Sequence, residues 1–98
     1  MYLFNASFYI EENDILAWNS WVRGEFLPRV KEASGGLKGE QYEVISSRAG
    51  SMRIFSIQWR CVEEELDILD KAVAEQLGNY QAQGADPSTW FCSIMKML

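Results

Sequence analysis

Polar side chains recur at every second position in two separate segments of the chain, residues 5–9 and 56–60. Successive side chains of a strand point to opposite faces, so each set shares one face if its segment is extended. Amide, hydroxyl, phenol and guanidinium groups can orient a small polar or aromatic ligand, and Arg60 can pair with a carboxylate or an enolate. The predicted ligand-binding residues are Asn5, Ser7, Tyr9, Ser56, Gln58 and Arg60.

Two interpretations of this polar set stay open. The simpler one, which we favour, is a sheet face that is solvated or buried in a dimer and whose polar groups satisfy one another. The other is a cavity in which Asn5, Tyr9 and Arg60 stabilise a substrate carbanion without metal or histidine. That arrangement would suit a cofactor-free oxygenase.

The composition excludes several kinds of chemistry. The chain has no histidine, which rules out histidine acid–base catalysis, histidine-ligated metal and a histidine pH switch. We predict neither a metal nor a cofactor. With 9 Lys and Arg against 14 Asp and Glu, the formal net charge is −5, so electrostatic binding of nucleic acid is not expected.

The lack of a signal-peptide pattern and of a membrane-spanning run, together with the cysteine count, favours a cytoplasmic protein with free thiols. The first ten residues lack a basic region and contain polar Asn5 and Ser7, unlike a signal peptide, and no apolar run reaches membrane-spanning length. Cys61 and Cys92 allow one disulfide at most, and a core of this size does not need it. We interpret both as free and Cys92 as a buried structural thiol.

Hydrophobic periodicity divides the chain into alternating strand-like and helix-like segments. Its length of 98 residues with 48% hydrophobic residues fits one domain spanning residues 1–98. Three glycines between residues 34 and 40 predict a loop there. The predicted strands are residues 2–10, 41–48, 52–61 and 89–97, and the predicted helices are residues 12–33 and 63–83.

The first predicted helix has an apolar stripe and is expected to be distorted. Pro28 would clash with the carbonyl of Gly24, four residues earlier, so a kink between them is expected on the solvent side. Both Trp18 and Trp21 are expected in the core; Trp21 flanks the stripe and is the better candidate of the two for an interface or the rim of a cavity. The stripe consists of Ile15, Trp18, Val22, Phe26, Val30 and Ala33.

The order strand, helix, strand, strand, helix, strand predicts an α+β, ferredoxin-like fold, the split βαβ (βαββαβ) pattern. In it, a four-stranded antiparallel sheet has its first and third strands in the centre and both helices on one face. The other face then needs water or a partner. A homodimer that buries this open face is the economical arrangement, and we expect no membrane contact.

The whole chain resembles a small bacterial family without an assigned activity, built like the dimeric α+β barrel proteins that include the antibiotic-biosynthesis monooxygenase-like domains. The resemblance implies the fold and a homodimer, but no activity. A histidine commonly stands in that family where this chain has Phe26, so any role of that histidine is absent or dispensable here. The resemblance rests on Phe4-Asn5, Trp18 with Trp21, Glu25-Phe26-Leu27-Pro28, Gln58-Trp59 and an apolar last strand.

Three functions follow as expectations. The leading one is a cytoplasmic homodimer that binds a small ligand. The first alternative is a cofactor-free, monooxygenase-like enzyme acting on a small aromatic or enolic compound. The second is a protein-interaction module, which would be a monomer with Trp21 or the edge strands exposed.

Overall fold

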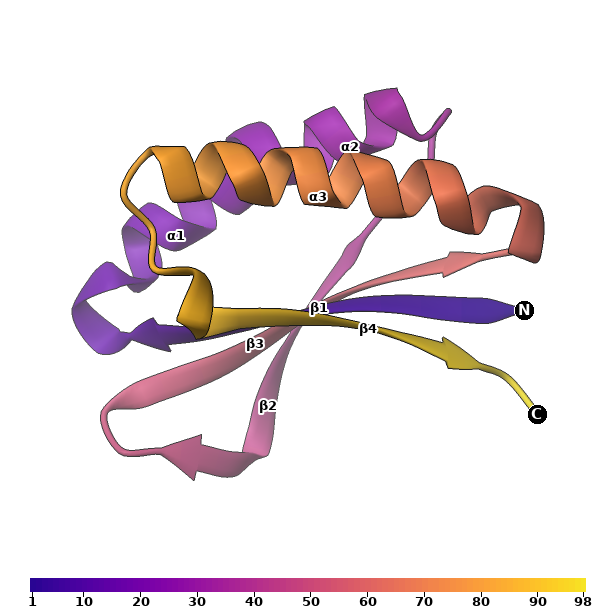
Figure 1. Cartoon of the computed structure of the whole chain (residues 1–98). Coiled ribbons are helices and arrows are strands. Elements are labelled where there is room, and N and C mark those ends of the chain that lie inside the picture. The colour runs from indigo at the N-terminus through magenta and orange to yellow at the C-terminus, as the bar shows by residue number, and fades with distance from the viewer.

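The computed structural model describes the backbone of residues 1–98 and every side chain except those of residues 46–49. Strands alternate with helical segments along the chain (Figure 1). The strands are β1 (Tyr2–Glu11), β2 (Glu40–Ala49), β3 (Met52–Cys61) and β4 (Trp90–Lys96). The helical segments are η1 (Glu12–Asp14), α1 (Ile15–Trp21), η2 (Val22–Phe26), α2 (Leu27–Ala33), η3 (Glu63–Glu65), α3 (Leu66–Ala82) and η4 (Pro87–Thr89).

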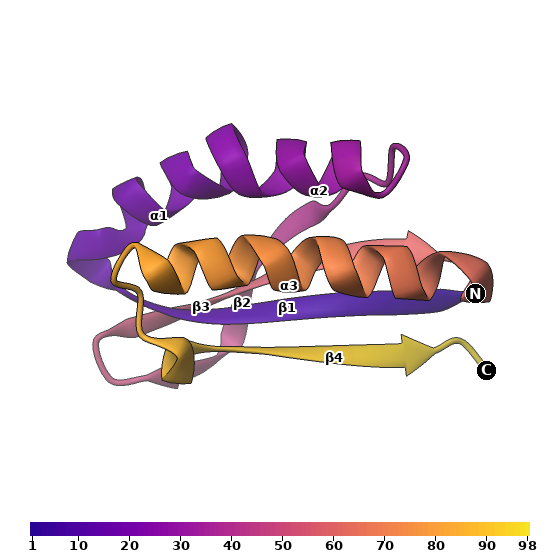
Figure 2. The same ribbon diagram turned by 45° about the horizontal axis from the view of Figure 1, so that its top comes forward.

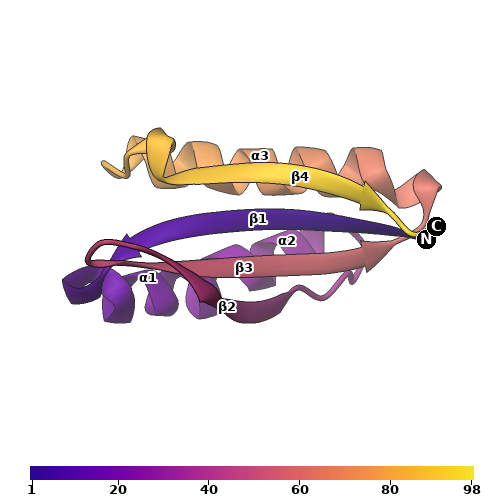
Figure 3. The same cartoon turned by 90° about the horizontal axis from the view of Figure 1, so that it is seen from below.

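The four strands form one antiparallel sheet in the order β2-β3-β1-β4. The first and third strands are therefore central and the second and fourth are edges, as predicted. All long helices lie on one face of the sheet, where α1 and α2 follow one another alongside α3 (Figure 2). Figure 3 views the opposite, uncovered face, which we call the open face. The predicted α+β, ferredoxin-like fold class is confirmed.

Strand alternation builds the core between the sheet and the helices. On β1, Phe4, Ala6 and Phe8 are buried toward the helices, beside Ile57 and Trp59 of β3. The helices contribute buried residues at three- and four-residue spacing, the period of one helix face. These residues are Trp18, Trp21, Val22, Phe26, Val30, Leu69, Ala72, Val73 and Leu77.

The segment predicted as one helix, residues 12–33, is continuous but contains a wide π turn, η2. The Leu27 N–H bonds to the carbonyl of Val22, five residues earlier. Steps of four residues drift by about 40° on a 3.6-residue helix, and the extra residue of a π turn absorbs this drift. Gly24 and Pro28 are exposed, so the predicted distortion lies on the solvent side. Ala33 is exposed, contrary to prediction; Ser34 is buried beside it.

Both cysteines are free thiols, as predicted. Cys61 is buried, but Cys92 is exposed, so its assignment as a buried residue was wrong. Cys92 lies opposite Ala6 on the edge strand β4, where the helix layer covers the sheet only in part. Within the described part of the chain, no helix combines the length and apolar character needed to cross a membrane.

Candidate functional site

Four of the six predicted site residues meet on the open face and hydrogen-bond to one another. Asn5 Nδ2 donates to Ser7 Oγ at 3.0 Å and to Ser93 Oγ at 3.3 Å. Ser56 Oγ donates to Asn5 Oδ1, and Gln58 Nε2 donates to Ser56 Oγ at 3.1 Å. We call these five residues the Asn5 network. Its polar groups largely satisfy one another, which leaves little bonding capacity for a ligand.

Burial within the chain supports the same conclusion. Asn5, Ser7 and Ser56 are only 7%, 8% and 5% exposed, although they face away from the helices. Each lies in the middle of the sheet and is covered by its cross-strand neighbours. The network is therefore a compact layer on the sheet.

The other two predicted residues do not join this network. Arg60 lies opposite Leu3, and Tyr9 lies opposite Ile54. At about 3.3 Å per residue, six residues along β1 separate these two positions by about 20 Å. Asn5, Tyr9 and Arg60 consequently do not surround one small substrate on this face.

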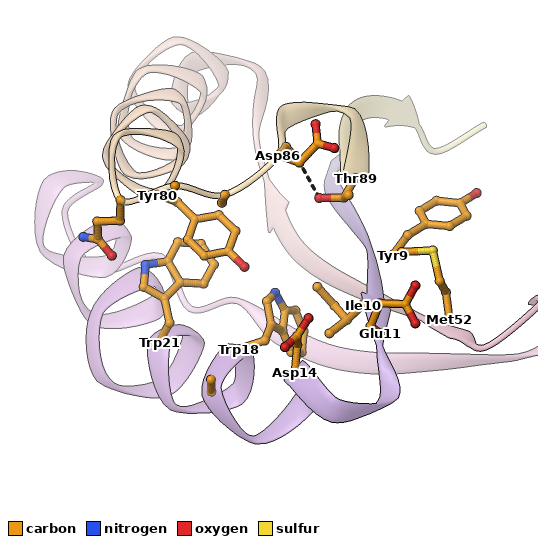
Figure 4. Close-up of a pocket in the computed structure, with 14 residues that line it drawn as sticks. Tyr9, Ile10, Glu11, Asp14, Trp18, Trp21, Met52, Tyr80, Asp86 and Thr89 are labelled. Atoms are coloured by element: carbon orange, nitrogen blue, oxygen red, sulfur yellow. Dashed lines mark hydrogen bonds between the residues drawn. The ribbon is translucent and has the colours of Figure 1, made fainter.

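A pocket of about 470 Å³ opens elsewhere, at the end of the molecule where β1 enters α1 and α3 ends. We call it the end pocket (Figure 4). Its volume is within the range of small-molecule sites, about 300–1,000 Å³. Tyr9 is the only predicted site residue that lines it. The lining residues are Tyr9, Ile10, Glu11, Asp14, Ala17, Trp18, Trp21, Met52, Tyr80, Gln83, Gly84, Ala85, Asp86 and Thr89.

Stacked rings fix one wall of the end pocket. Trp21 lies between Phe26, at a centroid distance of 4.7 Å, and Tyr80, at 4.0 Å, with interplanar angles of 15° and 17°. Trp18 stacks on Phe55 at 4.7 Å. Rings held on both sides have few alternative rotamers, so this wall is rigid. Trp21 is 9% exposed and belongs to the core, as predicted, and it also lines the end pocket.

The three carboxylates of the lining differ in what they bond. Glu11 accepts a hydrogen bond from Ser51 Oγ at 2.7 Å. Asp86 begins η4 and accepts from the backbone N–H and hydroxyl of Ser88, which lower the pKa of the Asp86 carboxyl. Among the described residues, Asp14 has no hydrogen bond or ion pair from its carboxylate, which makes no capping bond either.

Two further polar groups face the end pocket. Burial, and after it the charge of Asp14, raise the pKa of the Tyr80 phenol above its ordinary value. The phenol therefore stays protonated at neutral pH and can donate a hydrogen bond. Trp18 is 3% exposed, and its indole nitrogen has no hydrogen-bond partner among the described residues. Figure 4 shows this nitrogen on the side of the ring that faces Tyr80.

A smaller pocket of about 250 Å³ lies between α1 and the β2–β3 edge. Its polar groups are paired: Arg53 binds both carboxylate oxygens of Glu43 at 2.8 Å, and Gln41 donates to Asn19 Oδ1 at 3.1 Å. Like the Asn5 network, this cluster is structural. Across the residues whose side chains are described, no group of three or more His, Cys, Asp or Glu is arranged to hold a metal ion.

The residues that sequence reasoning missed are Asp14 and Tyr80. They are 66 positions apart in the chain and come together only because α3 ends beside the start of α1. From the sequence, Asp14 was explained as an acidic residue at the start of a helix. Tyr80 was explained as part of the apolar stripe of the second helix. Two other lining residues did have a sequence signal: Tyr9 as a predicted ligand-binding residue and Trp21 as the aromatic on the flank of the apolar stripe.

Comparison with known proteins supports the fold alone. No family model and no curated protein matches the chain. An ethyl tert-butyl ether D (EthD) family protein from Bacillus halodurans C-125 is similar at 13% identity and a TM-score of 0.64, with all of both chains covered. Rv0793 from Mycobacterium tuberculosis is similar at 14% identity and a TM-score of 0.60, covering 99% of this chain and 94% of that one.

A de novo designed protein, Foldit4, is similar at 9% identity and a TM-score of 0.60, covering 99% of this chain and 98% of that one. A designed chain thus shares this fold with natural ones. The architecture therefore carries no activity, and function must be argued from the site.

Proposed function

We propose that this protein is a homodimer that binds a small molecule in the end pocket. The observation that carries the proposal is the contrast in bonding: the end pocket combines volume, rigid rings and polar groups without partners. The Asn5 network and the β2–β3 edge pocket, by contrast, have paired polar groups. Unmet hydrogen-bonding capacity beside a cavity is what a ligand can use.

Filling the pocket tests the binding function. Ala17 lines the pocket on the exposed side of α1, so Ala17→Phe places a ring in its mouth. Ala74→Phe is the matched control, because Ala74 is an exposed helical alanine outside the pocket. We expect small aromatic compounds to give saturation-transfer NMR signals with the wild type and Ala74→Phe but not with Ala17→Phe. Equal signals from all three proteins, or none from any, would overturn the proposal.

The open face supports the homodimer. Phe91 and Met95 lie on it opposite Ser7 and Leu3 and are 51% and 44% exposed. Arg60 is exposed and has no ion pair among the described residues, while Glu40 is exposed on the neighbouring strand β2, opposite Gln58. A homodimer formed through this face would cover Phe91 and Met95 of both copies.

Light scattering across a dilution series tests this assembly. We expect twice the chain mass of 11.3 kDa for the wild type. Phe91→Glu places a charge in the interface and gives a monomer, whereas Leu16→Glu alters a residue that is 83% exposed on the helix side and leaves the dimer intact. A wild-type monomer at all concentrations refutes the dimer and identifies the open face as a docking surface for a different protein.

A second candidate function is a cofactor-free enzyme acting on a small aromatic or enolic compound. The observation in its favour is that Asp14, an unpaired carboxylate, and Tyr80, a protonated phenol, belong to the same pocket. A carboxylate base and a phenol donor suffice to remove a proton and stabilise the resulting oxyanion. Consumption of an enolic substrate by the wild type, lost in Asp14→Asn, would favour the enzyme over the binding protein.

A further inference from the structure

We infer that the end pocket selects a cationic ligand: an ammonium group on an aromatic or apolar body, with an oxygen acceptor at its other end. This inference rests on the proposed binding function and adds the chemical class of the ligand. Three features of the pocket carry it: the sign of its charges, the free carboxylate and the unpartnered donor on its inner wall.

The charged side chains of the lining all have one sign. Glu11, Asp14 and Asp86 are acidic, and no Lys or Arg is among the lining residues. The carboxyl end of α3 adds to this field, because Gln83 and Gly84 line the pocket and the last turn of α3 carries no basic residue. A helix C-terminus acts as about half a negative charge. A carboxylate or phosphate ligand would be repelled, and an ammonium group attracted.

Asp14 is the carboxylate that meets the ammonium. Glu11 and Asp86 are already bonded to Ser51 and Ser88. Figure 4 shows Asp14 beside Trp18, whereas Glu11 points toward Met52 and away from Tyr80. After burial, the charge of Asp14 is the second cause that raises the pKa of Tyr80, which lines the same pocket.

The rings of the pocket accommodate the body of the ligand and do not replace Asp14. Both faces of Trp21 are covered, by Phe26 and by Tyr80, and one face of Trp18 is covered by Phe55. A cation–π cage needs open ring faces, so Trp21 offers its edge to the ligand instead. Charge recognition therefore falls to the carboxylate.

The inner wall contains a hydrogen-bond donor that has no acceptor among the described residues. The indole N–H of Trp18 is buried and unpartnered, and leaving such a group unsatisfied is unfavourable. A ligand oxygen that accepts a hydrogen bond from this N–H would satisfy it. The preferred ligand thus has its ammonium group near Asp14 and its oxygen near Trp18.

Three probes of matched shape and different charge test the inference. Tyramine is a cation, tyrosol is its neutral alcohol analogue, and 4-hydroxyphenylacetate is the corresponding anion. Isothermal titration calorimetry at neutral pH should give affinities in the order tyramine, tyrosol, 4-hydroxyphenylacetate. Because an exposed ion pair contributes modestly, Asp14→Asn should weaken tyramine binding about two- to fivefold and leave tyrosol unchanged.

Asp67→Asn is the control for net charge. It removes one carboxylate from the first turn of α3, at the opposite end of that helix, and should not change tyramine affinity. Stronger binding of tyrosol or of the anion, blocked by Ala17→Phe, would refute the cationic class while preserving the binding function. An equal loss in Asp14→Asn and Asp67→Asn would refute a direct role of Asp14. Binding of all probes that is insensitive to Ala17→Phe would overturn the proposed function itself.

Discussion

The Asn5 network and the end pocket both contain polar groups but use them in opposite ways. In the network, the amide of Asn5 reaches hydroxyls on its own strand and on both neighbouring strands. In the end pocket, Asp14 and the indole nitrogen of Trp18 have no partner among the described residues. The two regions share the strand β1 and lie on opposite sides of the sheet.

The difference teaches that bonding capacity, more than polarity, distinguishes a site from a structural cluster. Paired hydrogen bonds in a covered position fix strand register and exclude ligands, because breaking them costs more than a weak ligand returns. Polar groups on a rigid wall beside an empty volume can bond a ligand without first breaking hydrogen bonds within the protein.

The largest effect is expected for Trp21→Ala, which removes the ring between Phe26 and Tyr80. Replacing a buried Trp by Ala costs about 3–5 kcal/mol of unfolding free energy. Urea denaturation measures the loss, and Trp21→Phe should recover most of it because a ring still stacks. A loss of unfolding free energy below about 1 kcal/mol would show that the ring wall of the end pocket is not rigidly packed and is not part of the core.

The next largest effect is expected for Asn5→Ala in the network. It leaves hydroxyls of Ser7, Ser56 and Ser93 without their amide partner, at a cost of about 2–3 kcal/mol. Ser93→Ala removes only the longest of these bonds and should cost less. Urea denaturation measures both. Tyramine affinity should be unchanged in Asn5→Ala; a weakened affinity would break the separation between the two regions.

The fold could be predicted from the sequence because strand alternation and helical spacing are local properties. Residues 52–61 were predicted as a strand and form β3 with the same bounds. The π turn in residues 22–26 was foreseen only as a kink, because Pro28 signals a distortion but not which hydrogen bonds replace the lost one. The exposure of Cys92 was missed because partial cover of an edge strand depends on where α3 lies above it.

The candidate site was predictable only in part. Alternation correctly placed Asn5, Ser7, Ser56 and Gln58 on one face, and the simpler interpretation of mutual bonding describes them. The end pocket depends on two helix ends meeting, which no periodicity encodes. Asp14 and Tyr80 each have an ordinary local explanation, so neither could be recognised without the tertiary structure.

The edge strand offers an intermediate case, a polar group that is partly covered and unpaired. Burial, and after it the charge of Asp70, raise the pKa of Cys92 from 9.0 to about 11. Between these values the folded chain keeps a proton that the unfolded chain loses, so stability falls as pH rises from about 9 to about 11. We expect the urea midpoint to decline over this window and the decline to be shallower in Cys92→Ala. An identical decline in both proteins would exclude Cys92 as its cause.

The smallest effect on stability is expected for Tyr80→Phe, which sharpens the comparison most directly. The ring continues to stack on Trp21, so the unfolding free energy should change by less than about 0.5 kcal/mol. The pocket loses its phenol donor, and tyramine affinity should fall about two- to threefold, since one neutral hydrogen bond contributes little net. Tyr42→Phe, at a tyrosine outside the end pocket, is the matched control and should change neither quantity. If tyramine affinity is unchanged in Tyr80→Phe, Tyr80 serves only as a wall, and the contrast with the Asn5 network then depends on Asp14 and Trp18 alone.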